Sequence, residues 1–266
     1  MTLTSLTAGA GCAGSPFRLP RRYLCVEWPE TTTFQEPNSQ EFCNPLTEHI
    51  REILGGRHLT PHIVQLAHHF WLCAFFHGAS RRHHASTYEH DHPSAITYIP
   101  RNAVLFLIDG TYGKIYLAAP ESAPHQELLA ALNGTLFPAR RYIERFQLKT
   151  FDLAPLRYLT PAVRHPSDAL APWAHLQLKG LTEREGGENG QRCKHLWPRD
   201  GFEPLDCGCL TWPAHIDSAI MGIKLGQRPR PYLAEFFQGS PWLRATIVPE
   251  TRHALAQLIH CCSRAG

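Results

Sequence analysis

Two short apolar runs joined by a tight turn most constrain what this chain can fold into. Residues 103–108 (AVLFLI) and 114–118 (KIYLA) each have the length of a strand, and Asp109-Gly110 begins the turn between them. An Asp-Gly pair between apolar runs is a strong hairpin signal, because both residues tolerate the backbone angles of a tight turn. Residues 95–99 are also strand-like, so the centre of the chain predicts an antiparallel sheet.

Further strands are predicted on both sides of this hairpin. Residues 68–77 (HHFWLCAFFH) form a mostly aromatic and apolar run, which favours a buried strand. Residues 142–152, 173–181 and 243–248 are strand-like, as are shorter pieces near 192–197, 208–212 and 220–225. Within 173–181, Leu176 and Leu178 alternate with His175, Gln177 and Lys179. That alternation predicts a strand with one buried and one polar face.

Several short helices are predicted around this sheet. Asn44 and Pro45 begin a helix over 45–54 that ends at Gly55-Gly56. Other helices are expected from Thr60 to about 67, from about Ser122 to Asn133-Gly134, over 231–238, and after Pro249. The fold class is therefore α+β, a mainly antiparallel sheet with several short flanking helices. We expect a disordered lead-in at 1–16 and a single domain over 17–266, with 186–190 as the one stretch that could mark a boundary within it.

Composition excludes several functional classes. The 266 residues are 43% hydrophobic, which suffices for a sizeable core, and the net charge of +3 is only mildly basic. No apolar stretch reaches membrane-spanning length, the N-terminus lacks the features of a secretory signal, and the nine cysteines are scattered. These features predict a cytoplasmic protein with no membrane partner. There is also no P-loop or G-x-G-x-x-G nucleotide-binding motif after a strand.

The order of four segments resembles a family of uncharacterised bacterial proteins. The segments are HFWLCAFFHG, SAITYIPRNAVLFLIDGTYGKIYLAA, FQLKTFDLAPL and WAHLQLKGL, which together span about 65–180. The resemblance implies a set of strands with a Y-x-P turn and a D-G hairpin. It implies no activity and assigns no catalytic residue.

Histidines are concentrated between residues 58 and 92. His69, His90-Asp91 and Asp109 follow the order of ligands in metal-dependent HD phosphohydrolases, which hold their ions with helices. The alternative is that 78–93 is a solvated polar loop, including Arg81-Arg82-His83-His84, whose histidines titrate near neutral pH.

Two cysteine-containing motifs suggest a zinc site. Cys193 and His195 are separated by one residue, as are Cys207 and Cys209, and thiolate and imidazole are the ligands that zinc prefers. Common zinc knuckles have two residues between paired cysteines, so the alternative is free thiols in or near the core. Cys73, flanked by bulky apolar residues, is expected to be buried and unreactive.

Small groups of arginines are candidates for nucleic-acid contact. They are Arg81 with Arg82, Arg140 with Arg141, and Arg228 with Arg230. Such groups can hold phosphates beside aromatic side chains, but they also occur as an ordinary solvated surface. Gln177 and Lys179 match the Q-x-K half of a restriction-type nuclease core, which would need Asp152 or Asp109 as its acidic partner.

These patterns leave two functional hypotheses. The first is a non-enzymatic binding or assembly subunit, in a bacterial nucleic-acid-handling or anti-phage defence complex. The second is a metal-dependent hydrolase or nuclease that uses the histidine-rich segment 58–92 with Asp91 or Asp109. Imidazoles that converge on a carboxylate, with an open coordination position, would favour the enzyme. Histidines spread along a loop would favour the binding subunit.

Overall fold

The computed structural model describes residues 21–28, 35–37, 40–55, 59–77, 81–89, 92–98, 102–138, 147–148, 150–168, 171–185, 190–226 and 229–262. For residues 81–89 and 92–98, and for Asn102 and Glu185, the description is limited to the backbone. The predicted lead-in at 1–16 lies outside the described residues, as do 186–189 of the predicted boundary.

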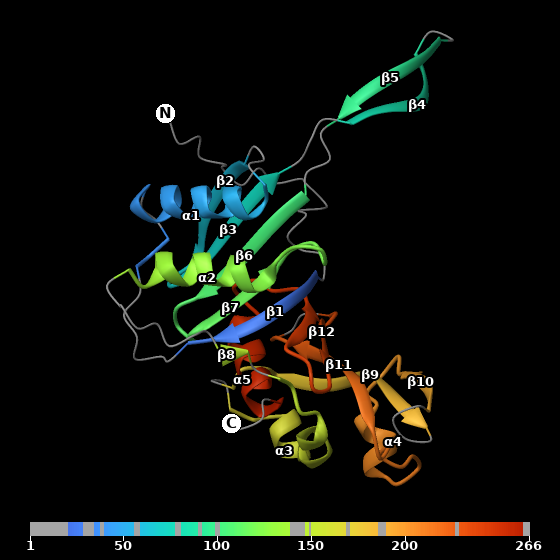
Figure 1. Ribbon diagram of the computed structural model, residues 1–266. Coiled ribbons are helices and arrows are strands. Elements are labelled where there is room, and N and C mark those ends of the chain that lie inside the picture. The colour runs from blue at the N-terminus through green and yellow to red at the C-terminus, as the bar shows by residue number, and fades with distance from the viewer. Residues whose placement is uncertain are drawn as a thin grey trace.

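Eleven strands form one sheet, which confirms the predicted α+β fold with a mainly antiparallel sheet (Figure 1). The strand order is β10-β9-β11-β12-β13-β1-β7-β6-β3-β2, and the short β8 pairs with β1 outside this order. We call β1, β2, β3, β6 and β7 the N-terminal half of the sheet and β9 to β13 its C-terminal half. The two halves are joined where β1 pairs with β13 in an antiparallel register.

The strands of the N-terminal half are β1 (Arg21–Glu27), β2 (Leu59–Ala67), β3 (Phe70–His77), β6 (Asn102–Asp109) and β7 (Lys114–Ala118). Those of the C-terminal half are β9 (His175–Glu185), β10 (Gln191–Leu196), β11 (Ile216–Lys224), β12 (Tyr232–Phe237) and β13 (Trp242–Ala245). β8 spans Gln147–Leu148. The helices are α1 (Gln40–Ile53), α2 (His125–Leu136), the 3₁₀-helix η1 (Ala154–Tyr158), α3 (Pro161–Arg164), α4 (Phe202–Asp206) and α5 (Arg252–Cys262).

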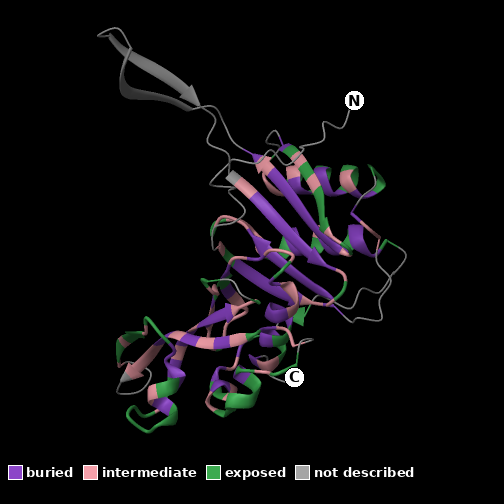
Figure 2. Ribbon diagram, turned by 180° about the vertical axis from the view of Figure 1, so that it is seen from behind, coloured by how far each residue is buried: buried purple, intermediate pink, exposed green. Residues whose placement is uncertain are grey.

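Helices α1 and α2 cover one face of the N-terminal half (Figure 1). Phe42, Leu46 and Ile50 of α1 share a buried face and pack with Trp71 and Phe106 of the sheet. The opposite face of the same strands is buried as well, in a core that includes Leu72 and Tyr116. β3, β6 and β7 are therefore buried on both faces and coloured as buried along most of their length in Figure 2.

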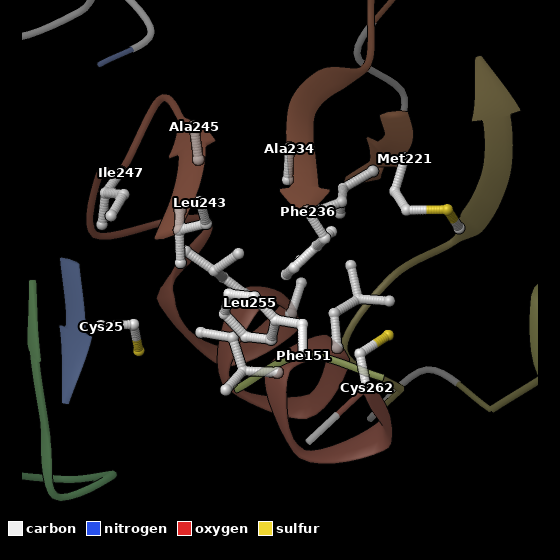
Figure 3. Close-up of a cluster of buried hydrophobic side chains, with 14 of the residues drawn as sticks. Cys25, Phe151, Met221, Ala234, Phe236, Leu243, Ala245, Ile247, Leu255 and Cys262 are labelled. Atoms are coloured by element: carbon white, nitrogen blue, oxygen red, sulfur yellow. The ribbon is translucent and has the colours of Figure 1, made fainter. Parts of the chain in front are cut away.

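Helix α5 packs on the inner face of the C-terminal half. Figure 3 shows Leu255 of α5 beside Phe151 and close to Phe236 of β12 and Leu243 of β13. The rings of Phe151 and Phe236 meet edge to face at 5.1 Å. The core of this half is therefore one-sided, with α5 as its cover.

The hairpin and the alternating strand are confirmed. β6 and β7 pair around Asp109, with Ile108 opposite Ile115. Leu176 and Leu178 of β9 are buried, and the alternate residues His175, Gln177 and Lys179 are partly exposed. The buried strand predicted at 68–77 is confirmed over 70–77 as β3, whereas His68 and His69 lie in the turn before it.

Two predicted helices are wrong because they are strands. Residues 60–67 belong to β2, which is an edge of the sheet, where Pro61 is tolerated because its missing N–H is not needed for pairing. Residues 232–237 form β12, although the spacing of Tyr232, Leu233, Phe236 and Phe237 also fits one face of a helix. In β12 Ala234 and Phe236 point to the core and Leu233 is 48% exposed, which is a strand alternation.

The predicted loop at 78–93 is also wrong for its described residues. β4 (Arg81–Glu89) and β5 (His92–Tyr98) pair with each other as a separate two-stranded sheet, drawn away from the main sheet in Figure 1. β5 contains most of the strand predicted at 95–99, whereas the polar sequence of β4 had predicted a loop. The two strands pair with each other, and among the described residues neither pairs with a strand of the main sheet.

Several element ends differ from the prediction. α1 begins at Gln40, not Pro45, because Phe42 extends its buried face by one turn. α2 continues through Asn133-Gly134 to Leu136, which is buried. Residues 207–213 contain no strand, and only 147–148 of the predicted long strand at 142–152 is assigned as one within the described residues. The stop at Gly55 is confirmed, with a φ of +73°.

Candidate metal centre

Two imidazoles and one carboxylate converge beside the start of β9. His165, His175 and Asp200 each offer one ligand atom, and these atoms all lie within 4.8 Å of one another. Within the described part of the chain, this is the single group of three or more such side chains that meets that distance. Its members come from the turn after α3, from the first residue of β9, and from the segment before α4.

Asp200 is the rigid member of this group. Its Oδ1 accepts hydrogen bonds from the backbone N–H groups of Leu178 (3.0 Å) and Phe202 (3.1 Å). Its Oδ2 lies 3.3 Å from Nε2 of His175. The side chain of Asp200 is only 6% exposed, against 26% for His175. One carboxylate oxygen is thus fixed by the backbone, and the other is aimed at the imidazole.

His165 is placed by the anchoring of the short helix α3. The hydroxyl of Thr160 caps this helix by accepting from the N–H of Val163, and the carbonyl of Val163 accepts from the indole of Trp173 at 2.9 Å. Arg164 is buried, pairs with Asp206 and lies over the ring of Phe202 at 4.4 Å. These contacts hold the turn against α4, so that the exposed His165 stands beside the ring of His175, at 4.1 Å between centroids.

The electrostatics favour a neutral His165. Desolvation lowers its pKa, and the neighbouring His175 and Arg164 lower it further. A neutral imidazole has a free lone pair, which is the form that binds a metal ion.

Two other side chains of β9 support the group. The side-chain amide of Gln177 lies 3.5 Å from Nδ1 of His175. The ammonium of Lys179 donates to the carbonyls of Pro198 (3.2 Å) and Arg199 (2.7 Å), which directly precede Asp200. Desolvation lowers the pKa of Lys179. The Q-x-K pair of the sequence therefore lies next to an acidic residue, but that residue is Asp200 and neither Asp109 nor Asp152.

Two of the four residues of the predicted histidine-rich site occupy neighbouring turns. The carbonyl of His69 accepts a hydrogen bond from the N–H of Gly110, next to Asp109, at 2.7 Å. The imidazole of His69, however, pairs with Glu36 at 3.2 Å. His90 and Asp91 lie outside the described residues, so the complete set stays a prediction.

Asp109 is a buried acid at the end of β6. The residue is 0% exposed, and its Oδ1 accepts from the N–H of Thr111 at 3.1 Å. Its Oδ2 has no hydrogen-bond partner among the described residues. Desolvation raises the pKa of Asp109 to about 6, although the nearby Arg252 lowers it in part. This carboxyl therefore titrates closer to neutral pH than an exposed aspartate.

The predicted zinc set is divided between two places. Cys193 and His195 lie on β10, where His195 pairs with Glu183 of β9. Cys207 and Cys209 follow α4, with their sulfurs 2.9 Å apart. No three ligand atoms of these residues lie within 4.8 Å of one another, as those of the His165 group do. Cys73 is buried with a raised pKa, caused by desolvation, as predicted.

Most of the predicted arginine groups lie where no side chain is described. Arg140, Arg141 and Arg228 are outside the described residues, and Arg81 and Arg82 are described by their backbone alone. Arg230 is exposed. Nucleic-acid contact through these arginines therefore stays a prediction.

A polar pocket lies near the other end of β9. It has a volume of about 240 Å³ and is lined by Arg157, Arg184, His215, Asp152, Asp217 and Gln238, together with Ala154, Ala214 and Ile216. Asp217 is paired with Arg184 and Arg192 at 3.1 and 2.8 Å. Arg157 donates to the carbonyls of Pro213 and Ala214, and the amide of Gln238 donates to Asp152 at 3.3 Å. The polar groups of this pocket thus contact one another or the backbone.

The sequence analysis missed His165 and Asp200 as site residues. They lie 10 residues before and 25 residues after His175 and belong to no spaced motif. The one available signal was the polar face of β9, which includes His175, Gln177 and Lys179. No protein-family model matches the chain, and no curated protein matches it in sequence.

Proposed function

We propose that this chain is a metal-dependent hydrolase whose ion, zinc by preference, is held by His165, His175 and Asp200. The observation that carries the proposal is the convergence of two imidazoles and a buried, oriented carboxylate at a solvent-accessible place. Convergence of this kind is the feature that separates an enzyme from a passive binding subunit. It occurs outside the histidine-rich segment 58–92, to which the alternative hypothesis of a hydrolase or nuclease had assigned it.

The number and type of ligands support a catalytic and not a structural ion. Structural zinc sites are closed by four protein ligands, whereas catalytic sites use three and leave a position for water or substrate. The described residues supply three, and the exposure of His165 leaves one side open. An ion held there would supply the usual zinc chemistry, which is to lower the pKa of bound water to about 7 and to polarise a carbonyl or phosphoryl oxygen.

The neighbouring residues would orient the ligands. For an ion on Nε2 of His175 the ring proton would sit on Nδ1. The Gln177 amide, whose nitrogen lies 3.5 Å from Nδ1, would then turn over so that its oxygen accepts from that proton. The two backbone N–H groups that donate to Asp200 fix the position of its carboxylate. Lys179 holds the chain segment that leads to Asp200.

Zinc titration of the full chain tests the ligand set. We expect one zinc ion per chain at this site, and an affinity lower by at least about tenfold in His175→Ala and in Asp200→Asn. Asn at 200 keeps an oxygen for the N–H groups of Leu178 and Phe202, so its loss of affinity would not reflect a local loss of structure.

His195→Ala is the matched control. His195, like His175, is an imidazole paired with a carboxylate, but its partner is Glu183 and it lies on β10. Zinc lost in His195→Ala and kept in His175→Ala would contradict the proposal and favour the set with Cys193, Cys207 and Cys209. The same titration repeated with Cys207→Ser and Cys209→Ser shows whether these two exposed thiols contribute to zinc binding.

Hydrolysis is tested with chromogenic p-nitrophenyl esters of acetate and phosphate on the zinc-loaded protein. We expect turnover that His175→Ala abolishes and His195→Ala preserves. Zinc bound at the predicted residues without turnover of either ester class would retain the metal site and reject the hydrolase.

A binding or assembly subunit that contacts nucleic acid is the second candidate. It is favoured by the separate hairpin of β4 and β5, in which Arg81 and Arg82 occupy consecutive positions opposite Tyr98 and Thr97. A two-stranded ribbon can enter the major groove, and an isolated hairpin is only marginally stable without a partner. We expect affinity for duplex DNA that falls steeply with salt and is weakened by Arg81→Gln with Arg82→Gln. Arg244→Gln, which removes an exposed arginine outside the predicted groups, should leave the affinity unchanged. Binding that is insensitive to salt would reject this candidate.

A further inference from the structure

Two cysteines after α4 form a close and exposed pair. The sulfurs of Cys207 and Cys209 are 2.9 Å apart. Both residues are exposed, and the other described cysteines are buried or half-buried. Their positions therefore combine two properties that a reactive dithiol needs, proximity and access.

The backbone of the turn brings the two side chains together. α4 ends at Asp206, the N–H of Cys207 bonds to the carbonyl of Glu203, and Gly208 adopts a φ of +73°. A Cβ on Gly208 would meet nothing within 4 Å, so the glycine is required by its conformation and not by space. The N–H of Leu210 bonds back to the carbonyl of Pro204 at 2.9 Å and closes the turn. The conformation of the turn after α4 therefore holds the two sulfurs close together.

We propose that Cys207 and Cys209 are a redox-active dithiol that exchanges with small-molecule disulfides such as glutathione disulfide. The thiolate of Cys207 attacks one sulfur of glutathione disulfide, which releases one glutathione thiolate and leaves a mixed disulfide on Cys207. The thiolate of Cys209 then attacks the sulfur of Cys207 and releases the second glutathione. The protein loses two electrons and two protons, and one glutathione disulfide is reduced to two glutathione molecules.

The local chemistry supports Cys207 as the attacking residue. The neighbouring Cys209 thiol lowers the pKa of Cys207 and thereby raises its thiolate fraction near neutral pH. A bond between residues two positions apart closes a very short loop, so it gains little from loop closure and is readily reduced. The pair is therefore suited to reversible exchange and not to stabilising the fold.

This dithiol is independent of the proposed metal ion. The same cysteines belong to the predicted zinc set, but the ligand atoms of Cys193 and His195 do not gather with theirs. Loss of the His165 site would leave the exchange intact, and loss of the exchange would leave the metal site intact.

The experiment uses the full reduced chain with a metal chelator in buffers of increasing glutathione disulfide. Trypsin cleaves after Arg199 and Lys224, and the resulting peptide Asp200–Lys224 contains no cysteines other than Cys207 and Cys209. After alkylation of free thiols, we expect this peptide to be unalkylated and lighter by two hydrogens than the reduced peptide. Dithiothreitol should restore the alkylated form.

Single substitutions separate an internal disulfide from two unrelated thiols. Cys207→Ser and Cys209→Ser should each retain one bound glutathione, because no second thiol resolves the mixed disulfide. Cys193→Ser is the matched control and should keep the internal disulfide. The proposal is overturned if the wild-type peptide carries two glutathiones, or if it stays reduced in buffers that glutathionylate the single-cysteine variants.

Discussion

The two halves of the sheet bury their strands in different ways. In the N-terminal half, β3 and β7 are buried at nearly every position, because α1 and α2 cover one face and the large core covers the other. In the C-terminal half, β9 and β12 alternate between buried and partly exposed positions. A strand that is buried on both faces has almost no position left for a polar side chain.

This difference explains where the chemistry of the molecule lies. The polar face of β9 carries His175 at one end and Arg184 at the other, beside the candidate metal centre and the polar pocket respectively. In the N-terminal half, the carboxyl whose pKa is raised, Asp109, lies at the end of a strand, next to a turn. Sites are thus expected on one-sided strands and at strand ends.

The strongest test of the comparison is truncation of neighbouring side chains. Phe70→Ala and Phe75→Ala remove buried rings from opposite faces of β3, and each should cost about 3–5 kcal/mol of unfolding free energy. In β9, Leu178→Ala should cost about 2–5 kcal/mol and Gln177→Ala less than about 0.5 kcal/mol. Urea denaturation measures all four. A small cost for either phenylalanine would show that its face is not packed.

The next effect concerns the buried charge of Asp109. Its pKa is raised in the folded protein to about 6, from an ordinary value of 3.8. The proton therefore stabilises the fold fully below pH 4, and this stabilisation is lost as the pH rises through 6. Asp109→Asn removes the titration and keeps an oxygen for Thr111. At pH 8 the variant should be more stable than the wild type by up to about 3 kcal/mol.

The control for Asp109→Asn is the same comparison at acid pH. At pH 4 the two proteins should have similar unfolding free energies in urea, because the carboxyl is then protonated in the fold. A variant that is less stable than the wild type at pH 8 would show that the ionised Asp109 is stabilised by Arg252 more than it is destabilised by burial.

The third effect is stabilisation of the fold by zinc bound to His165, His175 and Asp200. Zinc at about 100 times its dissociation constant should stabilise the fold by about 2.7 kcal/mol. Thermal unfolding should show this shift in the wild type and in His195→Ala, but not in His175→Ala. A shift that survives in His175→Ala would place the ion elsewhere.

Thiol alkylation should have the smallest effect on stability, but its rate should differ strongly between exposed and buried cysteines. Burial raises the pKa of Cys25 to about 12 and also raises the pKa of Cys73, whereas Cys207 is exposed and its pKa is lowered. Iodoacetamide should modify Cys207 in the folded protein without changing its unfolding free energy. Cys25 and Cys73 should react only after unfolding, and early labelling of either would contradict the two-sided burial of β1 and β3.

Strands with strong local patterns could be predicted from the sequence. The runs at 68–77, 103–108 and 114–118 correspond to β3, β6 and β7, and the alternation of Leu176 and Leu178 gave the inner face of β9. The prediction was wrong for 60–67 and 231–238. In those segments short apolar spacings fit both a helix and a strand, and pairing with neighbours decides between them.

The candidate metal centre could not be predicted in the same way. His165 is held by contacts of α3 with Trp173 and α4, and Asp200 by N–H groups from β9 and α4. The residues that hold His165 and Asp200 lie at sequence separations that belong to no known motif. The cysteine pair was visible as a motif, but its exposure and its separation from Cys193 required the fold.

The sequence by itself determined the fold class, the central hairpin and the face of β9 that carries polar groups. Those features depend on alternation and on turn residues, which act over a few neighbouring positions. Only the tertiary structure decided that His165, His175 and Asp200 meet, because strand pairing and the packing of α3 on α4 bring together segments up to 35 residues apart. Local patterns fix elements, and long-range packing fixes which of their polar residues become neighbours.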